Sequence, residues 1–279
     1  MKPARKAFGK NLLFIILVIT LFTSCQKELA YDNVVTSSPH LTSIHDFDYD
    51  KLRIDSFSYN NSGYLIRLQQ WTYDDTSRIK LLDSADFAFS FSDNGLPPSS
   101  YTQSSMTAGT SNPSVKHLLY YDSKNRIVKD SLLNGTTGNW VVTNYGFGTN
   151  YIVADKFLKN NPGLVKNETD SIFISASNNV ANIVFYGSSL NYFSQHIFTY
   201  NSNLNPCYDK TMAESLGKLL SEITDEDFVS QNLSSSITWA DQSPLLQTAN
   251  FTAITDAKGR VIKVQQVGKN HFYTYQFNN

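Results

Sequence analysis

Residues 87–91 read Phe-Ala-Phe-Ser-Phe and residues 273–277 read Tyr-Thr-Tyr-Gln-Phe, so aromatic side chains alternate with small or polar ones. Successive side chains of a β-strand point to opposite faces of its sheet, and this period of two therefore places each aromatic trio on one face. Turn-forming stretches such as Asn-Asn-Ser-Gly at 60–63 separate runs of this kind from about residue 50 onward. The pattern predicts an all-β domain built from antiparallel hairpins.

The hairpins recur along the chain at similar intervals. Equivalent positions are Tyr59, Phe91, Tyr121, Phe147, Ile174 and Tyr200. The clearest copies are 59–67, 121–129 and 254–263, each with a β-prone residue, a polar turn and an aliphatic strand that carries a base. These copies resemble the YD-type repeats of bacterial surface proteins. We predict an antiparallel β-meander of about 12–16 strands that forms one strongly curled or barrel-like sheet.

One segment departs from the β pattern. Apolar side chains at Met212, Leu216, Leu219, Leu220 and Ile223 follow the spacing i, i+4, i+7, i+8 and i+11, which is a helical stripe. We expect one inserted amphipathic helix near 210–223 that packs on an open sheet edge or on the mouth of the curled sheet.

Charge argues against one class of partner. The chain has 23 Lys and Arg against 24 Asp and Glu, and four of the bases precede residue 25. Without that leader, 19 bases face 24 acids, a balance near −5. Nucleic-acid binding requires a basic surface, so we exclude it. Hydrophobic residues make up 41% of the chain and charged residues 17%, a balance typical of a folded core and not of a disordered acidic chain.

The leader has the form of a secretory signal peptide. Four bases in residues 1–10 precede the apolar run Leu12–Phe22, which only Thr20 interrupts. This run is shorter than the roughly 20 residues that span a bilayer as a helix. The order of basic, apolar and small residues predicts a signal peptide over 1–24.

Residues 21–25, Leu-Phe-Thr-Ser-Cys, resemble the lipobox of bacterial lipoproteins, with Phe22 in the place where that pattern prefers Leu. The resemblance implies that Cys25 is acylated, for example with palmitate, and anchors the protein in the membrane. Gln26-Lys27-Glu28 is similar to the tags that direct Bacteroidetes lipoproteins to the cell surface. The alternative is an ordinary thiol near a conventional signal-peptide cleavage site.

Together, these features resemble a Bacteroidetes lipoprotein family of unknown function, whose domain is an antiparallel sheet with a porin-like curl. The resemblance covers roughly residues 45–279. It implies a lipid anchor and tether over 25–45, a single β-meander domain over 46–279, and a place at the outer membrane or cell surface. It brings no catalytic residues. Residues 271–277 are also like the aromatic last strand of outer-membrane barrels, but many predicted strands carry charge or amide on both faces, which disfavours a membrane-spanning barrel.

Candidate metal and catalytic motifs are weak. The five histidines lack metal-ligand spacing. Asp46, Asp48 and Asp50 have the spacing of a calcium loop's first ligands, but Lys51 and Phe57 hold the positions that need Gly and Glu, so we predict a solvated edge strand. No cofactor or metal is expected.

Two further features have simple structural interpretations. The carboxylates of 225–227, Asp-Glu-Asp, leave a glycan-active hydrolase as a remote alternative, although a helix-end turn is the simpler interpretation. Serine-hydrolase, phosphate-loop and zinc-protease motifs do not occur, and we predict a non-enzymatic protein. Cys207 then remains as the single thiol of the body, expected to be buried or in a turn.

Binding is the remaining functional hypothesis. Trp71, Trp140 and Trp239 accompany 16 Tyr, and exposed aromatic residues stack on sugars or anchor protein partners. We therefore expect a ligand- or partner-binding envelope lipoprotein, with a glycan or a neighbouring outer-membrane protein as partner. A binding face would combine one or two of these Trp with Tyr, Asn and Asp on the concave side of the sheet. The alternative is a purely structural envelope lipoprotein whose aromatic residues fill the core.

Overall fold

The computed structural model describes residues 40–61, 63–78, 80–92, 97–135, 137–187, 192–208, 215–224, 227–240 and 246–278. The chain divides into two units, Met1–Ser38 and Pro39–Asn279, and every described residue lies in the second. The predicted signal peptide, Cys25 and residues 25–39 of the predicted tether therefore lie outside the described residues. Within the described ranges, no helix has the length and apolar character needed to cross a membrane.

Seventeen strands and one helix form the described part of the chain. They are β1 Leu41–Asp48, β2 Lys51–Tyr59, β3 Leu65–Tyr73, β4 Leu81–Ser90, β5 Ser100–Thr107, β6 Thr110–Ser111, β7 Val115–Tyr121, β8 Ile127–Leu133, β9 Trp140–Phe147, β10 Tyr151–Asn160, β11 Gly163–Ile174, β12 Val180–Gly187, β13 Tyr192–Leu204, α3 Gly217–Thr224, β14 Asn232–Ala240, β15 Gln247–Thr255, β16 Val261–Gln266 and β17 His271–Phe277.

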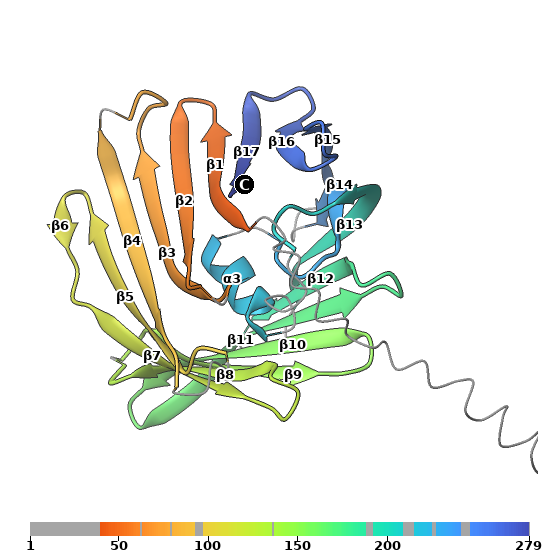
Figure 1. Cartoon of the computed structure of the whole chain (residues 1–279). Coiled ribbons are helices and arrows are strands. Elements are labelled where there is room, and N and C mark those ends of the chain that lie inside the picture. The colour runs from red at the N-terminus through yellow and green to blue at the C-terminus, as the bar shows by residue number, and fades with distance from the viewer. Residues whose placement is uncertain are drawn as a thin grey trace, which may run out of the picture. The chain divides into compact units, whose positions relative to one another are not determined.

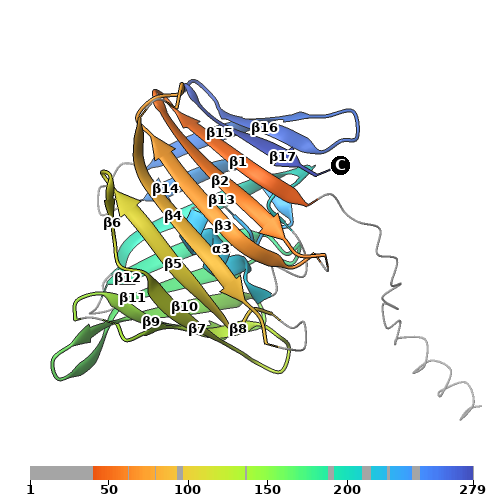
Figure 2. The ribbon, with the colours of Figure 1, turned by 60° about the vertical axis from the view of Figure 1, so that its left-hand side comes forward.

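The strands close into a barrel (Figures 1 and 2). Each strand pairs antiparallel with its sequence neighbour, and β1 pairs with both β2 and β17. The two-residue β6 pairs only with β5 among the described strands, and β5 pairs directly with β7, so sixteen of the seventeen strands form the closed ring. The all-β prediction of a barrel-like antiparallel meander is confirmed.

The closure of the barrel shows that one prediction is wrong. The acidic segment 45–50 was expected on a solvated edge strand, but β1 is hydrogen-bonded on both sides and has no free edge. The correct pairing joins residues more than 200 positions apart, which local sequence does not reveal. The strand also begins at Leu41, within the segment that the sequence analysis assigns to the tether.

The two ends of the barrel differ. At one end, which we call the helix end, lie the start of β1, the end of β17 and the long β13–β14 connection that contains α3. There the Asn278 N–H donates to the carbonyl of His40 (3.1 Å). The other end, which we call the open end, has the hairpins that follow β1, β3, β8 and β10.

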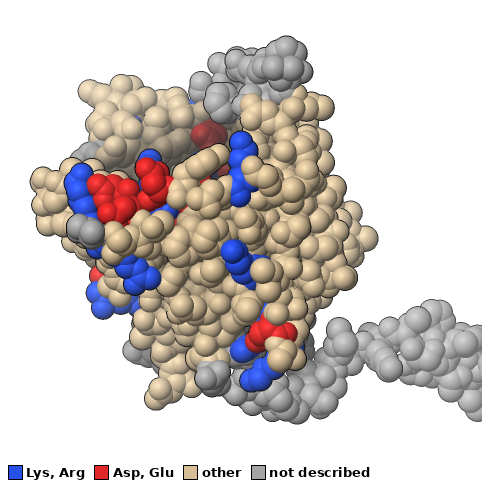
Figure 3. Space-filling model, turned by 90° about the horizontal axis from the view of Figure 1, so that it is seen from above, with Lys and Arg blue, Asp and Glu red and all other residues tan. Residues whose placement is uncertain are grey.

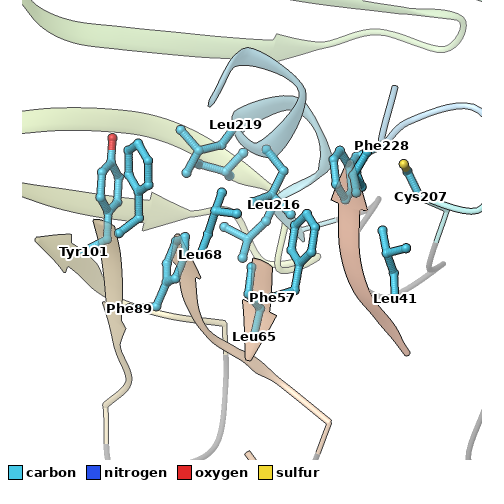
Figure 4. Close-up of a cluster of buried hydrophobic side chains, with 14 of the residues drawn as sticks. Leu41, Phe57, Leu65, Leu68, Phe89, Tyr101, Cys207, Leu216, Leu219 and Phe228 are labelled. Atoms are coloured by element: carbon cyan, nitrogen blue, oxygen red, sulfur yellow. The ribbon is translucent and has the colours of Figure 1, made fainter. Parts of the chain in front are cut away.

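The lumen beside α3 is filled by an apolar core (Figure 4). Phe87 and Phe89 are buried and pack near Tyr101, with ring centroids 6.1 Å and 5.6 Å from it. In the second aromatic trio, Tyr275 is buried and Tyr273 and Phe277 pack against the core. Each alternating stretch thus faces the lumen, as its period predicts.

The helix α3 lies inside the ring of strands (Figures 1 and 2). Leu216, Leu219 and Leu220 are buried in the core, where Figure 4 shows the first two facing Leu68 and Phe57. The predicted amphipathic helix is therefore confirmed, but it fills the lumen and covers no sheet edge. Residues 209–214, where we expected its start, lie outside the described residues.

Barrel side chains cap the C-terminal end of α3. The last carbonyls of a helix lack partners within the helix. Gln70 Nε2 donates to the Ile223 carbonyl (3.2 Å), and an Arg53 guanidinium N–H donates to the Thr224 carbonyl. The same Arg53 forms a two-pronged ion pair with Asp55 (3.0 and 3.1 Å). These contacts tie the helix to β2 and β3.

The outer face of the barrel carries ion pairs and hydrogen bonds between polar side chains. Arg67 pairs with Asp86 (2.8 Å) across β3 and β4, and Lys166 pairs with Asp155 (2.6 Å) across β10 and β11. Thr238 and Thr248 hydrogen-bond across β14 and β15 (3.0 Å). Seen from above, the molecule has charged residues of both signs in small groups among uncharged ones (Figure 3).

Candidate binding site

A cavity of about 720 Å³ lies in the lumen beside the polar face of α3. Phe185, Phe198, Ile237 and Phe251 from β12–β15 form an apolar wall. Their positions on successive strands face the same side because directly paired residues share a face of the sheet. Trp140, at the open-end start of β9, lines the cavity and is 42% exposed, so the cavity reaches the open end.

Charged side chains form the part of the cavity nearest the helix. Lys156 Nζ on β10 lies 2.8 Å from Glu168 Oε1 and 2.9 Å from Asp170 Oδ2, both on β11. From α3, Lys218 Nζ lies 3.1 Å from Glu222 Oε1 and 3.8 Å from Asp170. We call these five residues the lumen ion cluster. They connect the helix to the β10–β11 wall.

Asp170 is the most buried member of the lumen ion cluster. Its side chain is only 1% exposed, and its Oδ1 atom has no hydrogen-bond partner among the described residues. Burial raises the pKa of Asp170 above its ordinary value, although the charges of Lys156 and Lys218 oppose that rise. A buried carboxylate oxygen without a donor is costly, so it marks a place where a donor from outside the chain would be stabilised.

Lys156 is held in its charged form. Burial disfavours its ammonium group, but the carboxylates of Glu222 and Asp170 outweigh burial and raise its pKa above the ordinary value. The indole of Trp140 lies with its centroid 5.5 Å from Lys156 Nζ, a cation–π contact at the cavity wall. Lys156 is thus fully engaged with residues of the chain.

Two tyrosines extend this polar network through the core. The Tyr145 hydroxyl donates to Glu222 Oε2 (3.0 Å), and the Tyr101 hydroxyl donates to Asp130 Oδ2 (3.0 Å). His117 Nδ1 lies 2.9 Å from the other oxygen of Asp130. Burial, reinforced by these carboxylates, raises the pKa of both tyrosines well above the ordinary value. Both therefore act as neutral donors that fix carboxylate positions.

No protein-family model matches the chain, and no curated protein matches it in sequence. Solved structures do match. A porin-like protein from Bacteroides uniformis ATCC 8492 superposes with a TM-score of 0.58 at 11% identity, over 85% of this chain and 98% of that one. A porin-like protein from Bacteroides vulgatus ATCC 8482 gives a TM-score of 0.46 at 10% identity, over 86% and 99%. The first likeness shows a shared fold, an antiparallel β-barrel.

The three candidate Trp residues occupy different places on the barrel. Trp140 lines the cavity. Trp239 pairs with His196 and Gln247, two lumen-side positions, and its indole N–H donates to Gln247 Oε1 (3.2 Å). Trp71 instead pairs with Ile54 and Ser84 on the outer face. The structure therefore brings two of the three to the concave side and leaves the third outside.

The other predicted candidates do not assemble into a catalytic centre. Asp225 and Glu226 lie outside the described residues, and Asp227 Oδ1 accepts the backbone N–H groups of Val229 (3.0 Å) and Ser230 (2.8 Å) in a turn. In the described part of the chain, no group of three or more His, Cys, Asp or Glu is placed to hold a metal. Cys207 is buried, as expected from its turn position.

The lumen ion cluster was not among the predicted sites. Glu168 and Asp170 are two residues apart on one strand and therefore share a face, and Lys218 and Glu222 are four apart on the polar side of the helix. Both spacings were visible, but each is also common on solvated surfaces. Only the pairing of β10 with β11 and the position of α3 show that they meet inside the barrel.

Proposed function

We propose that this protein is a lipid-anchored envelope β-barrel without catalytic activity, whose lumen binds a small ligand. The cavity is the observation that carries the proposal. Its volume of about 720 Å³ lies within the range of about 300–1,000 Å³ typical of ligand sites, and its apolar wall meets a few converging charged groups.

The outer face supports a barrel that stands in water. A barrel embedded in lipid carries an apolar band about 25 Å tall on its outside. Here the ion pairs Arg67–Asp86 and Lys166–Asp155 lie on that face, within their strands. Membrane attachment would then come from the acylated Cys25 at the outer membrane, on the periplasmic or the surface side.

The point at which the chain enters the barrel supports ligand access from the opposite end. The chain enters the barrel at His40 on the helix end, whereas the cavity reaches the open end at Trp140. A ligand, or a glycan or protein partner that presents one, would approach from the side opposite to the attachment point.

A matched pair of substitutions tests binding in the lumen. Thr143 lines the cavity, whereas the adjacent Asn144 is exposed on the outer face of the same strand. We expect the neutral dye N-phenyl-1-naphthylamine to gain fluorescence with wild type and Asn144→Trp, and to lose that gain with Thr143→Trp. Equal fluorescence for both variants, with both folded by circular dichroism, would favour the structural lipoprotein instead.

A labelling experiment tests the anchor. Cells that express the full-length protein are grown with a fatty-acid analogue, and wild type is compared with Cys25→Ala. We expect label in wild type and none in the variant, and protease treatment of intact cells then reports whether the barrel is on the surface. An unlabelled wild type would contradict the anchor while leaving the lumen proposal unaffected.

A further inference from the structure

We propose that the lumen ligand is a cationic amphiphile: a molecule with an apolar body and an ammonium or similar charged donor group. The inference rests on the proposed function, because it names the chemistry of the molecule that the cavity takes.

The charge of the cavity favours a cation. Among the described residues, the charged side chains that line it are Lys156, Lys218, Glu168, Asp170, Glu222 and Asp227. Two ammonium groups thus face four carboxylates, a formal excess of two negative charges inside the barrel. An anionic ligand would be repelled there, because charge interactions are stronger in the low dielectric of the lumen.

The hydrogen bonds of the cavity favour a donor. Both lysines are already engaged with carboxylates at 2.8–3.1 Å. In contrast, Asp170 Oδ1 is a buried acceptor without a partner among the described residues. The site therefore has an acceptor to offer a ligand and no uncommitted lysine. A primary ammonium group carries three donors and no acceptor, which matches this inventory.

The apolar wall favours a ligand with a hydrophobic body. Phe185, Phe198, Ile237 and Phe251 line the cavity from four successive strands. Burying apolar surface against them contributes about 25 cal/mol per Å². A sugar would leave this wall poorly covered, because most of its surface consists of hydroxyl groups. The cavity thus combines an apolar wall for the body with an acceptor for the head group.

Isothermal titration calorimetry of the wild-type protein with three probes tests the chemical class of the lumen ligand. Dodecylammonium chloride and sodium dodecanoate share one alkyl chain and carry opposite charges, and maltotriose stands for a glycan. Both amphiphiles are used below their micelle concentrations. We expect dodecylammonium to bind at least about tenfold more tightly than dodecanoate, and maltotriose to bind more weakly than either.

Variants connect that preference to the cavity. Asp170→Asn keeps the shape of the side chain and removes its charge, so the affinity for dodecylammonium should fall about tenfold or more. Asp155→Asn is the matched control, because Asp155 lies on the outer face of the neighbouring strand with Lys166. Its affinity should match wild type. If Asp170→Asn does not fold, Glu168→Gln at a more exposed position should lower the affinity about fivefold.

The outcomes separate the two proposals. Dodecanoate or maltotriose binding as tightly as dodecylammonium, and lost in Thr143→Trp, would overturn the cationic class while supporting a ligand-binding lumen. Dodecylammonium binding that Asp155→Asn weakens as much as Asp170→Asn would show attraction to the acidic surface and overturn the site. No binding of any probe, the neutral dye included, would overturn both proposals.

Discussion

Lys156 is the single residue on which the charge balance of the lumen most depends. Its ammonium group contacts Glu168 and Asp170 and lies 3.9 Å from Glu222. Lys156→Met keeps the length of the side chain but leaves three carboxylates with one cation. Removing one partner of a buried ion pair costs about 3–5 kcal/mol, so we expect a loss of that size in the free energy of unfolding.

Urea denaturation measures this effect of Lys156. The control is Lys159→Met, on the same strand near the open end, where the ammonium group reaches only the Gly135 carbonyl (3.2 Å) in an exposed contact. Exposed substitutions usually change stability by about 0.5 kcal/mol or less. Equal effects of the two substitutions would show that the lumen ion cluster does not stabilise the barrel.

The raised pKa of Tyr145 predicts how the stability of the fold responds to alkaline pH. Burial and the adjacent Glu222 raise the pKa of its hydroxyl well above the ordinary value, whereas in the unfolded chain the pKa is about 10. The unfolded state therefore releases its proton first, and the stabilisation by Tyr145 is complete below pH 10 and declines as the pH rises above it. Tyr145→Phe lacks both the hydrogen bond to Glu222 and this decline.

We expect Tyr145→Phe to be less stable than wild type by about 1–3 kcal/mol at pH 7, and the difference to shrink as the pH rises beyond 10. Denaturation at a series of pH values measures it. A difference that stays constant across the series would show that the Tyr145 hydroxyl titrates alike in the folded and unfolded chain.

Four hairpins at the helix end have turns of the same type. In the turns 122–126 and 256–260, the first residue is an aspartate whose carboxylate accepts the backbone N–H groups of the residues two and four positions later. The same carboxylate pairs with the side chain of the arginine four positions later. The position three residues after the first has a left-handed backbone in all four turns. These positions are Gly63, Asn125, Asn178 and Gly259. The polar residues of these turns therefore determine a specific backbone conformation.

The turn at Gly259 provides an element-scale prediction. Its φ of +77° is unfavourable for a residue with a Cβ, and no atom lies within 4 Å of the place a Cβ would take. Gly259→Ala should therefore cost about 1–2 kcal/mol through backbone strain alone. Gly146→Ala on β9, also in open space and without a positive φ, should be neutral or slightly stabilising. Thermal unfolding of both variants compares them, and equal melting temperatures would contradict the strain.

At the scale of the whole molecule, the sequence predicts the strands and the helix better than it predicts which of them come into contact. The alternation at Phe87 and Phe89 reveals a strand and its buried face because only neighbours in the chain decide it. The closure of β1 on β17 and the placement of α3 inside the ring depend on contacts between distant segments. The binding cavity depends on the same contacts, so its charged residues could not be recognised from spacing alone.

The distribution of side chains between the lumen and the outer face predicts how the whole barrel behaves in solution. The apolar residues Leu68, Phe87 and Tyr275 fill the lumen, and ion pairs such as Arg67–Asp86 lie outside. A chain that starts at residue 26 lacks the leader and Cys25 but keeps every described strand. Because the proposed barrel stands in water, we expect it to fold without detergent and to unfold cooperatively on heating. A mild non-ionic detergent should leave its melting temperature unchanged. A chain that becomes β-structured only in micelles would show that lipid contacts the outer face, and the barrel would then have to cross the membrane.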